Sequence, residues 1–117
     1  MKDYKVIFKA GEKEYSAIFN LNVMEEIQQE YGTVEKWGEL TDAKHGEVNA
    51  KALIFGLRAM INEATDIENE EKGENKPFLT LKQVGRLITQ AGLVQSAETL
   101  NNAVVEATKS DNNSKNA

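Results

Sequence analysis

The sequence predicts an α+β fold, in which an N-terminal β-hairpin packs against a bundle of four to five α-helices. Two observations lead to this prediction. Apolar and polar residues alternate with a period of two over residues 2–19, which is typical of half-buried strands. From residue 20 onward, apolar residues recur three and four positions apart, which is the spacing of amphipathic helices.

The length and composition indicate one domain. The chain has 117 residues, no cysteine and a formal net charge of −5. We predict that residues 1–108 form a single α+β domain. We expect residues 109–117 to form a disordered polar tail, because they contain no apolar residue larger than alanine. The lack of cysteine excludes disulfides, thiol catalysis and cysteine-ligated zinc. The charged N-terminus has no signal-like apolar stretch, so we expect a soluble protein in the cytoplasm.

The hairpin register follows from a two-residue turn at Gly11 and Glu12. Glycine at the first central position favours a type II′ turn, which matches the twist of the strands. The pairs that face each other are then Tyr4 with Phe19, Phe8 with Tyr15, and Lys9 with Glu14. Aromatic pairs share one face and opposite charges meet on the other, so register and pattern agree. A two-stranded hairpin is marginal alone, and its aromatic face must therefore lie on helices.

The other face of the hairpin carries Ile7 and Ile18 among charged residues. One interpretation is that a loop or helix partly covers them, since scattered surface apolar residues are normal. The other is that they form an exposed edge that binds a partner. We favour the first and keep both residues as candidate partner contacts.

Caps and stops divide the remaining chain into helices. Asn20 or Asn22 begins the first, Tyr31 and Gly32 end it, and Thr33 begins a short second helix. A long helix is predicted from about Glu47. Its polar end and the following residues, 65–77, are predicted to be a frayed end and a mobile loop. A capping-box pattern at Thr80–Gln83 begins a fourth helix that ends at Gly92, and the last helix is predicted from about Gln95 to Thr108.

Two residues in the helices have a predicted packing role. Trp37 is the only tryptophan, and a core anchor is a better interpretation than a stacking platform for a ligand. Gly56 lies inside the long helix, where glycine costs up to about 1 kcal/mol relative to alanine. Its presence predicts either a close contact or a bend.

The sequence gives no positive support for an enzyme or a cofactor. His45 is the only histidine and lies in a predicted loop without cysteine to join it as a metal ligand. Residues 66–77 begin like a calcium loop, but Glu71 occupies the position of the required glycine and Pro77 that of the bidentate glutamate. No phosphate-binding glycine motif is present. An enzyme would need a pocket with converging perturbed groups.

The order of the predicted hairpin and helices along the chain resembles that of a known protein family. The segments FNLNVMEEIQQEYG and LTLKQVGRLI, in a chain with a hairpin, a long helix and a last helix, resemble the tail assembly chaperones of long-tailed phages and prophages of Gram-positive bacteria. The resemblance extends from about Tyr4 to Ala107. It implies a chaperone that binds the tape measure protein and helps to recruit tail tube protein subunits around it. It also implies action in the bacterial host cytoplasm and absence from the mature virion.

The resemblance further implies a longer form of the same protein, made by ribosomal frameshifting. Lys115 and Asn116 are the only Lys-Asn dipeptide, and suitable codons with a Ser114 codon ending in A would form a slippery heptamer. An ordinary amide-rich tail explains the same residues. The alternative function is a small phage-derived nucleic-acid-binding regulator, which would need a basic face, whereas the chain has only two arginines and is acidic.

The tape measure protein is expected to be long and helical. We therefore expect one of its helices to dock in a groove between the long helix and the last helix. The candidate contacts are Leu100, Val104 and Val105. Packing inside the domain is the better interpretation for each of them taken singly.

Overall fold

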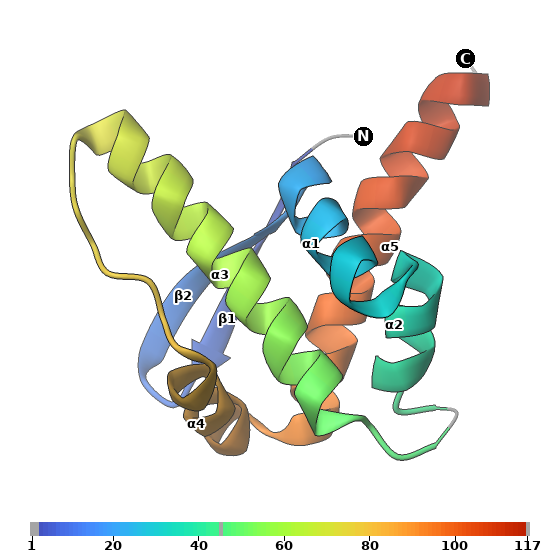
Figure 1. Cartoon of the computed structure of the whole chain (residues 1–117), viewed down its shortest axis with the longest axis horizontal. Coiled ribbons are helices and arrows are strands. Elements are labelled where there is room, and N and C mark those ends of the chain that lie inside the picture. Colours follow the sequence, from blue (N-terminus) through green and yellow to red (C-terminus); the bar gives the residue numbers. More distant parts are fainter. Residues whose placement is uncertain (1–2, 45, 117) are drawn as a thin grey trace.

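The computed structural model of the chain describes residues 3–44 and 46–116, with side chains described as far as residue 109. The described part contains β1 (Tyr4–Ala10), β2 (Lys13–Phe19), α1 (Leu21–Tyr31), α2 (Val34–Thr41), α3 (Ala50–Lys72), α4 (Leu81–Ala91) and α5 (Leu93–Asn116) (Figure 1). The predicted α+β fold, with a hairpin followed by five helices, is confirmed.

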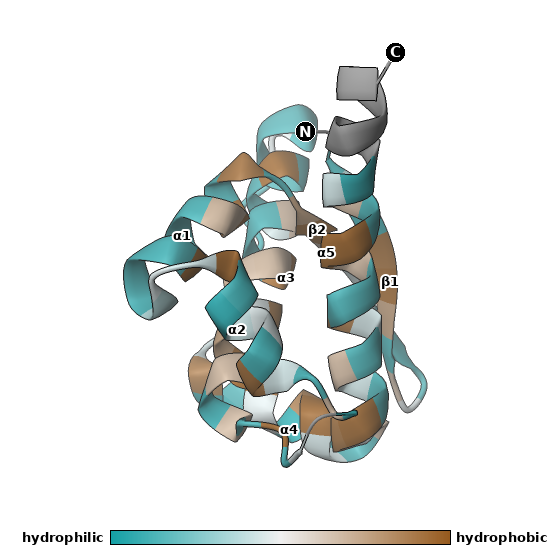
Figure 2. Ribbon diagram, turned by 90° about the vertical axis from the view of Figure 1, so that its right-hand side faces the viewer, coloured by the Kyte–Doolittle hydropathy of each residue, from teal (hydrophilic) through white to brown (hydrophobic). Residues whose placement is uncertain are grey.

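The helices α3 and α5 lie in the middle of the molecule. The hairpin covers one side of them and the helices α1 and α2 lie on the other, while α4 closes one end (Figures 1 and 2). In this arrangement α3 packs along β2, α5 packs along β1, and α4 contacts α3, α5 and β1. Hydrophobic and hydrophilic residues alternate in bands along the ribbon of α5, as expected for a helix with one buried face (Figure 2).

The hairpin has the predicted register. The observed partners include Tyr4 with Phe19, Phe8 with Tyr15, and Lys9 with Glu14. Gly11 has a φ of 64° and no described non-glycine residue has a positive φ, which is the pattern of a type II′ turn. The tip packs against α4. A Cβ added to Gly11 would lie 3.1 Å from Cδ of Gln90 and closer still to its amide nitrogen.

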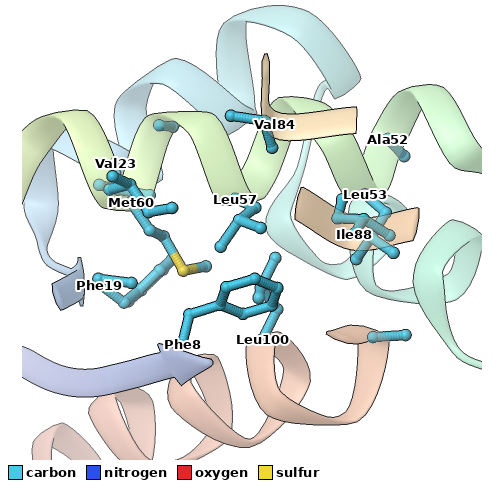
Figure 3. Packing of buried hydrophobic residues seen from close by; sticks show 14 of the residues in the cluster. Phe8, Phe19, Val23, Ala52, Leu53, Leu57, Met60, Val84, Ile88 and Leu100 are labelled. Atoms are coloured by element: carbon cyan, nitrogen blue, oxygen red, sulfur yellow. The ribbon is translucent and has the colours of Figure 1, made fainter. Parts of the chain in front are cut away.

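Side chains from both strands and from the middle helices meet in one core. Phe8 and Phe19 point from the hairpin toward Leu57 and Met60 of α3 and Leu100 of α5 (Figure 3). All five are at most 2% exposed. Burial of each such side chain stabilises the fold by about 1.5–3 kcal/mol before the entropy cost of folding is counted. The predicted packing of the aromatic face on helices is confirmed.

Trp37 anchors α2 to α3. Its side chain is fully buried, and the indole Nε1–H donates a hydrogen bond of 2.8 Å to the carbonyl oxygen of Ala52. The ring lies directly over Gly56, where an added Cβ would be 2.9 Å from Cε2 of Trp37. The hydroxyl of Thr41 donates to the carbonyl oxygen of Trp37 at 3.0 Å. The core-anchor interpretation is confirmed, and close contact is the reason for the glycine in α3.

The predicted helix caps are present. The side chains of Asn20 and Thr33 accept hydrogen bonds from the amides of Val23 and Lys36. Thr80 and Gln83 form the full capping box, and the helices α1 and α4 end at Gly32 and Gly92. Each such cap contributes about 1 kcal/mol.

The long helix begins later than predicted. Its first residue is Ala50 and not Glu47, because Asn49 is in an extended conformation and its side chain accepts from the amide of Ala52. Val48 is buried, with 7% exposure, although it precedes the helix. The apolar spacing therefore predicts a helical position for Val48, whereas Val48 enters the core from the loop before the helix.

The long helix also ends later than its polar composition suggested. It does not fray at Thr65 but continues to Lys72, where Gly73 caps it in the left-handed conformation with a φ of 64°. The amide of Gly73 donates to the carbonyl oxygen of Asn69. A C-terminal glycine of this kind is a stop signal that the composition of residues 65–77 concealed.

The last helix begins at Leu93, before the predicted Gln95, and its backbone is helical to Asn116, beyond the predicted end at Thr108. The division into a domain of residues 1–108 and a disordered tail of residues 109–117 stays a prediction. From Ser110 onward the side chains lie outside the described part, as does the whole of residue 117.

The contact between Trp37 and Gly56 can be tested by Gly56→Ala. The added methyl group improves the helix propensity by about 1 kcal/mol, but the clash with the indole costs about 1–3 kcal/mol and threatens its hydrogen bond. We expect a net loss of about 1–2 kcal/mol in the free energy of unfolding, measured by urea titration followed by circular dichroism.

Gly38→Ala is the matched control. Gly38 lies inside α2, and its added Cβ would come no closer than 3.9 Å to Oδ1 of Asn101. This variant should gain up to about 1 kcal/mol from helix propensity alone. Equal stabilisation by both substitutions would show that the indole does not constrain position 56.

Candidate protein-binding surface

The five predicted partner contacts have very different environments. Ile7 is 48% exposed and Val105 is 57% exposed, so both are available to a partner. Ile18 is 8% exposed and Leu100 is fully buried in the core, while Val104 is half-buried and packs against that core. Partner binding by these residues stays a prediction.

The two exposed residues lie on separate surfaces. Ile7 borders a hollow of about 300 Å³ between β1 and the junction of α4 and α5, where Gln90 and Thr99 also line it. Val105 borders a hollow of about 410 Å³ between α5 and the segment that follows α2, with Asn101 in its lining. The hollow beside Val105 is therefore bordered by the segment that follows α2, and not by α3 as the sequence suggested.

A residue that the sequence analysis missed is Phe78, which is 53% exposed. It lies in the segment of residues 74–80 between α3 and α4, which we call the strap. The next residue, Leu79, packs against the core, as does Val84 in the first turn of α4. These two occupy the positions of a hydrophobic staple beside the Thr80 cap. Because Leu79 takes the staple position, the neighbouring Phe78 does not enter the core. The staple pattern of Leu79 and Val84 around Thr80 can be recognised in the sequence.

Two asparagines of α3 hold the strap on both sides of Phe78. The amide of Asn62 donates to the carbonyl oxygen of Leu79 at 3.1 Å and accepts from its N–H at 2.9 Å. Asn69 makes the same pair of bonds to Lys76, at 3.1 and 3.0 Å. Paired amide contacts of this kind substitute for a strand partner and fix the backbone of an otherwise irregular segment.

An ion pair adds to this attachment. Nζ of Lys76 lies 2.7 Å from Oε1 of Glu68 and 3.8 Å from Oε1 of Glu74. The hydrogen bond from Lys76, with the charges of Lys72 and Lys76, lowers the pKa of Glu68 below its ordinary value. The same hydrogen bond raises the pKa of Lys76. The strap, of which residues 74–77 were predicted to belong to a mobile loop, is thus attached to α3 by side chains on both sides of Phe78.

Helix α1 lies antiparallel to α3 and contacts it through polar side chains. Oε2 of Glu63 accepts hydrogen bonds from the side-chain amides of Asn20 at 2.8 Å and Asn22 at 3.0 Å. Burial raises the pKa of Glu26 on α1, while the positive charge of Arg58 on α3 acts in the opposite direction. The start of α1 is therefore tied to the middle of α3.

Among the described side chains of residues 3–44 and 46–109, no group of three or more His, Cys, Asp or Glu residues is placed to hold a metal ion. His45 lies outside the described residues. No helix in the described part of the chain is long and apolar enough to span a membrane.

No family model matches the chain, and neither a curated protein nor a solved structure shows significant similarity to it.

The attachment of the strap can be tested by Asn62→Ala. This substitution leaves the N–H and C=O groups of Leu79 without partners in a partly buried place. An unsatisfied buried group costs about 1–3 kcal/mol. We expect the amide of Leu79 to exchange with deuterium about tenfold faster or more, which corresponds to about 1.4 kcal/mol.

Asn75→Ala is the control, because it also replaces an asparagine with alanine but at an exposed position of the strap. It should leave the exchange of the Leu79 amide unchanged. If Asn62→Ala also left it unchanged, the hydrogen bonds of Asn62 would not hold the strap.

The ion pair predicts a titration. In Lys76→Met the pKa of Glu68 should rise toward its ordinary value, as measured by NMR titration of its side-chain carboxyl carbon. Because the folded pKa is depressed, the pair stabilises the fold above the unfolded pKa, and this contribution is lost as the pH falls through the folded pKa. Lys82→Met, at an exposed lysine of α4, should leave the pKa of Glu68 in place. An unchanged pKa in Lys76→Met would contradict the assignment.

Proposed function

We propose that the chain is a tail assembly chaperone of a long-tailed phage or prophage, which acts by protein-protein binding and not as an enzyme. It binds the tape measure protein and helps to recruit tail tube protein subunits around it. It works in the cytoplasm of the bacterial host and is not part of the mature virion. Its partners include a longer, frameshifted form of itself.

The observation that carries the proposal is the correspondence between the two resembling segments and two capped units. The first segment, FNLNVMEEIQQEYG, spans the end of β2 and the whole of α1 between the caps Asn20 and Gly32. The second, LTLKQVGRLI, spans the capping box at Thr80 and most of α4. Each segment therefore corresponds to one helix with its own start and stop signals.

The surface of the protein is compatible with work as a holding chaperone. Seven large apolar side chains are exposed among the described residues: Ile7, Leu21, Phe78, Leu81, Leu93, Val94 and Val105. The net charge of −5 keeps such a protein soluble and repels its own copies. An aggregation-prone apolar partner could cover several of these side chains without the chaperone itself precipitating.

The proposal is tested by co-expression with the tape measure protein encoded by the same phage or prophage. We expect the tape measure protein to stay in the soluble fraction and to purify together with the chain. An unrelated acidic domain of similar size serves as the control for expression level. If the tape measure protein precipitates equally with both, the proposal is wrong.

The longer form is tested separately by intact-mass analysis of the products of the native gene with its downstream DNA. We expect a minor, longer species with the same N-terminus and a junction near Lys115. An AAG lysine codon together with a single short product would show that no frameshift occurs. The binding of the tape measure protein is tested independently by the co-expression experiment.

A further inference from the structure

Phe78 is a half-exposed aromatic side chain on a segment whose backbone is fixed. The strap residues on either side of it, Lys76 and Leu79, are each bonded twice by an asparagine of α3. A partner that contacts Phe78 therefore does not have to order the strap first. Aromatic side chains on prearranged backbone are the usual strong contacts of protein interfaces, because little conformational entropy is lost on binding.

Phe78 stands between two adjoining hollows, which together we call the Phe78 groove. One has a volume of about 220 Å³ and lies between α1 and the strap, with α3 as its floor. Val23 and Ala59 are its apolar lining residues besides Phe78. The other has a volume of about 460 Å³ and lies between the strap and the last turns of α3. Asp66 borders both hollows, so they form one continuous surface around the phenyl ring.

The charge of the groove selects its occupant. Two cationic side chains, Arg58 and Lys76, line it, and Lys76 is already paired with Glu68. The carboxylates that line it are Glu26, Glu63, Asp66, Glu70 and Glu74. A second copy of this acidic chain, or any acidic segment, would be repelled, whereas lysine or arginine side chains would be attracted.

We propose that the Phe78 groove is the docking site for a basic amphipathic helix of the partner protein, with the apolar side of that helix on Phe78 and its lysine and arginine side chains toward the carboxylates. This inference rests on the proposed function, because it assigns the surface and the chemistry of the partner segment. In helix-in-groove docking the apolar face of the helix contacts an apolar surface, and here Phe78 supplies that contact. The surrounding carboxylates supply the charge complementarity.

The test uses two probes with the full chain. One is the tape measure protein of the same phage or prophage. The other is a synthetic amphipathic helix of about 20 residues with leucine on one face and lysine on the other, together with its counterpart in which glutamate replaces lysine. Binding of both peptides is measured by fluorescence anisotropy at low and high salt.

Phe78→Ala tests the anchor, and Val94→Ala is its control, since Val94 is an equally exposed apolar residue at the start of α5. We expect Phe78→Ala to weaken binding of the lysine peptide and of the tape measure protein about tenfold or more, and Val94→Ala to change it less than twofold. Because Phe78 is half-exposed, the urea midpoint of the variant should stay close to that of the wild type, which separates a lost contact from lost folding.

The double variant Asp66→Asn, Glu70→Gln tests the charges. Its control, Glu35→Gln, Glu39→Gln, removes the same charge from exposed positions of α2. The first should weaken the lysine peptide severalfold at low salt and reduce the salt dependence of binding, whereas the second should have little effect. Equal effects of the two would mean that only net charge matters, and the groove would be rejected.

The two probes separate the inference from the function beneath it. If the tape measure protein binds the wild type and Phe78→Ala equally, the docking site is wrong and the proposed function stands. If the tape measure protein does not bind but the lysine peptide depends on Phe78, the function is wrong and the surface stands. No binding of the lysine peptide, or stronger binding of the glutamate peptide, would overturn the docking site.

Discussion

The contact of the Trp37 indole with the backbone at Gly56 is the constraint on which the arrangement of the helices depends. A fully buried tryptophan must place its N–H on an acceptor, and here the acceptor is the carbonyl oxygen of Ala52 in α3, which brings the ring against Gly56. Glycine is the one residue that permits this approach. The position of α2 on α3 then places Thr41, whose carbonyl and hydroxyl oxygens accept from the amide of Asn101, so α5 is joined to the same anchor.

Elements with a strong local signal could be predicted from the sequence. The hairpin register followed from residue alternation and Gly11, and the starts of α1, α2 and α4 followed from side-chain caps that act within one turn. The end of α3 could not be predicted from composition. Residues 65–72 have few apolar side chains, and their helix depends on the Gly73 cap and on the bonds that join Glu68 and Asn69 to Lys76 of the strap. Such attachments exist only in three dimensions.

The same distinction applies to the candidate surface. Periodicity marked Leu100 and Val104 because it finds apolar residues, but it does not distinguish an inner face from an outer one. Phe78 was overlooked because it stands in an irregular segment without a period. Only the folded chain brings Phe78 beside Glu26 of α1 and Asp66 of α3. The net charge, in contrast, can be read from the sequence alone. The acidic lining of the groove agrees with this negative charge.

The tip of the hairpin has a consequence for engineering the protein. Turns at hairpin tips usually tolerate inserted residues and affinity tags. Here the two-residue turn depends on the positive φ of Gly11, so an insertion would lose the type II′ turn that sets the register of the hairpin. Gly46 is a better place, since an added Cβ there would meet no atom within 4 Å. In related sequences, position 11 should stay glycine, since a side chain there would be strained at a φ of 64° whichever residue occupies position 90.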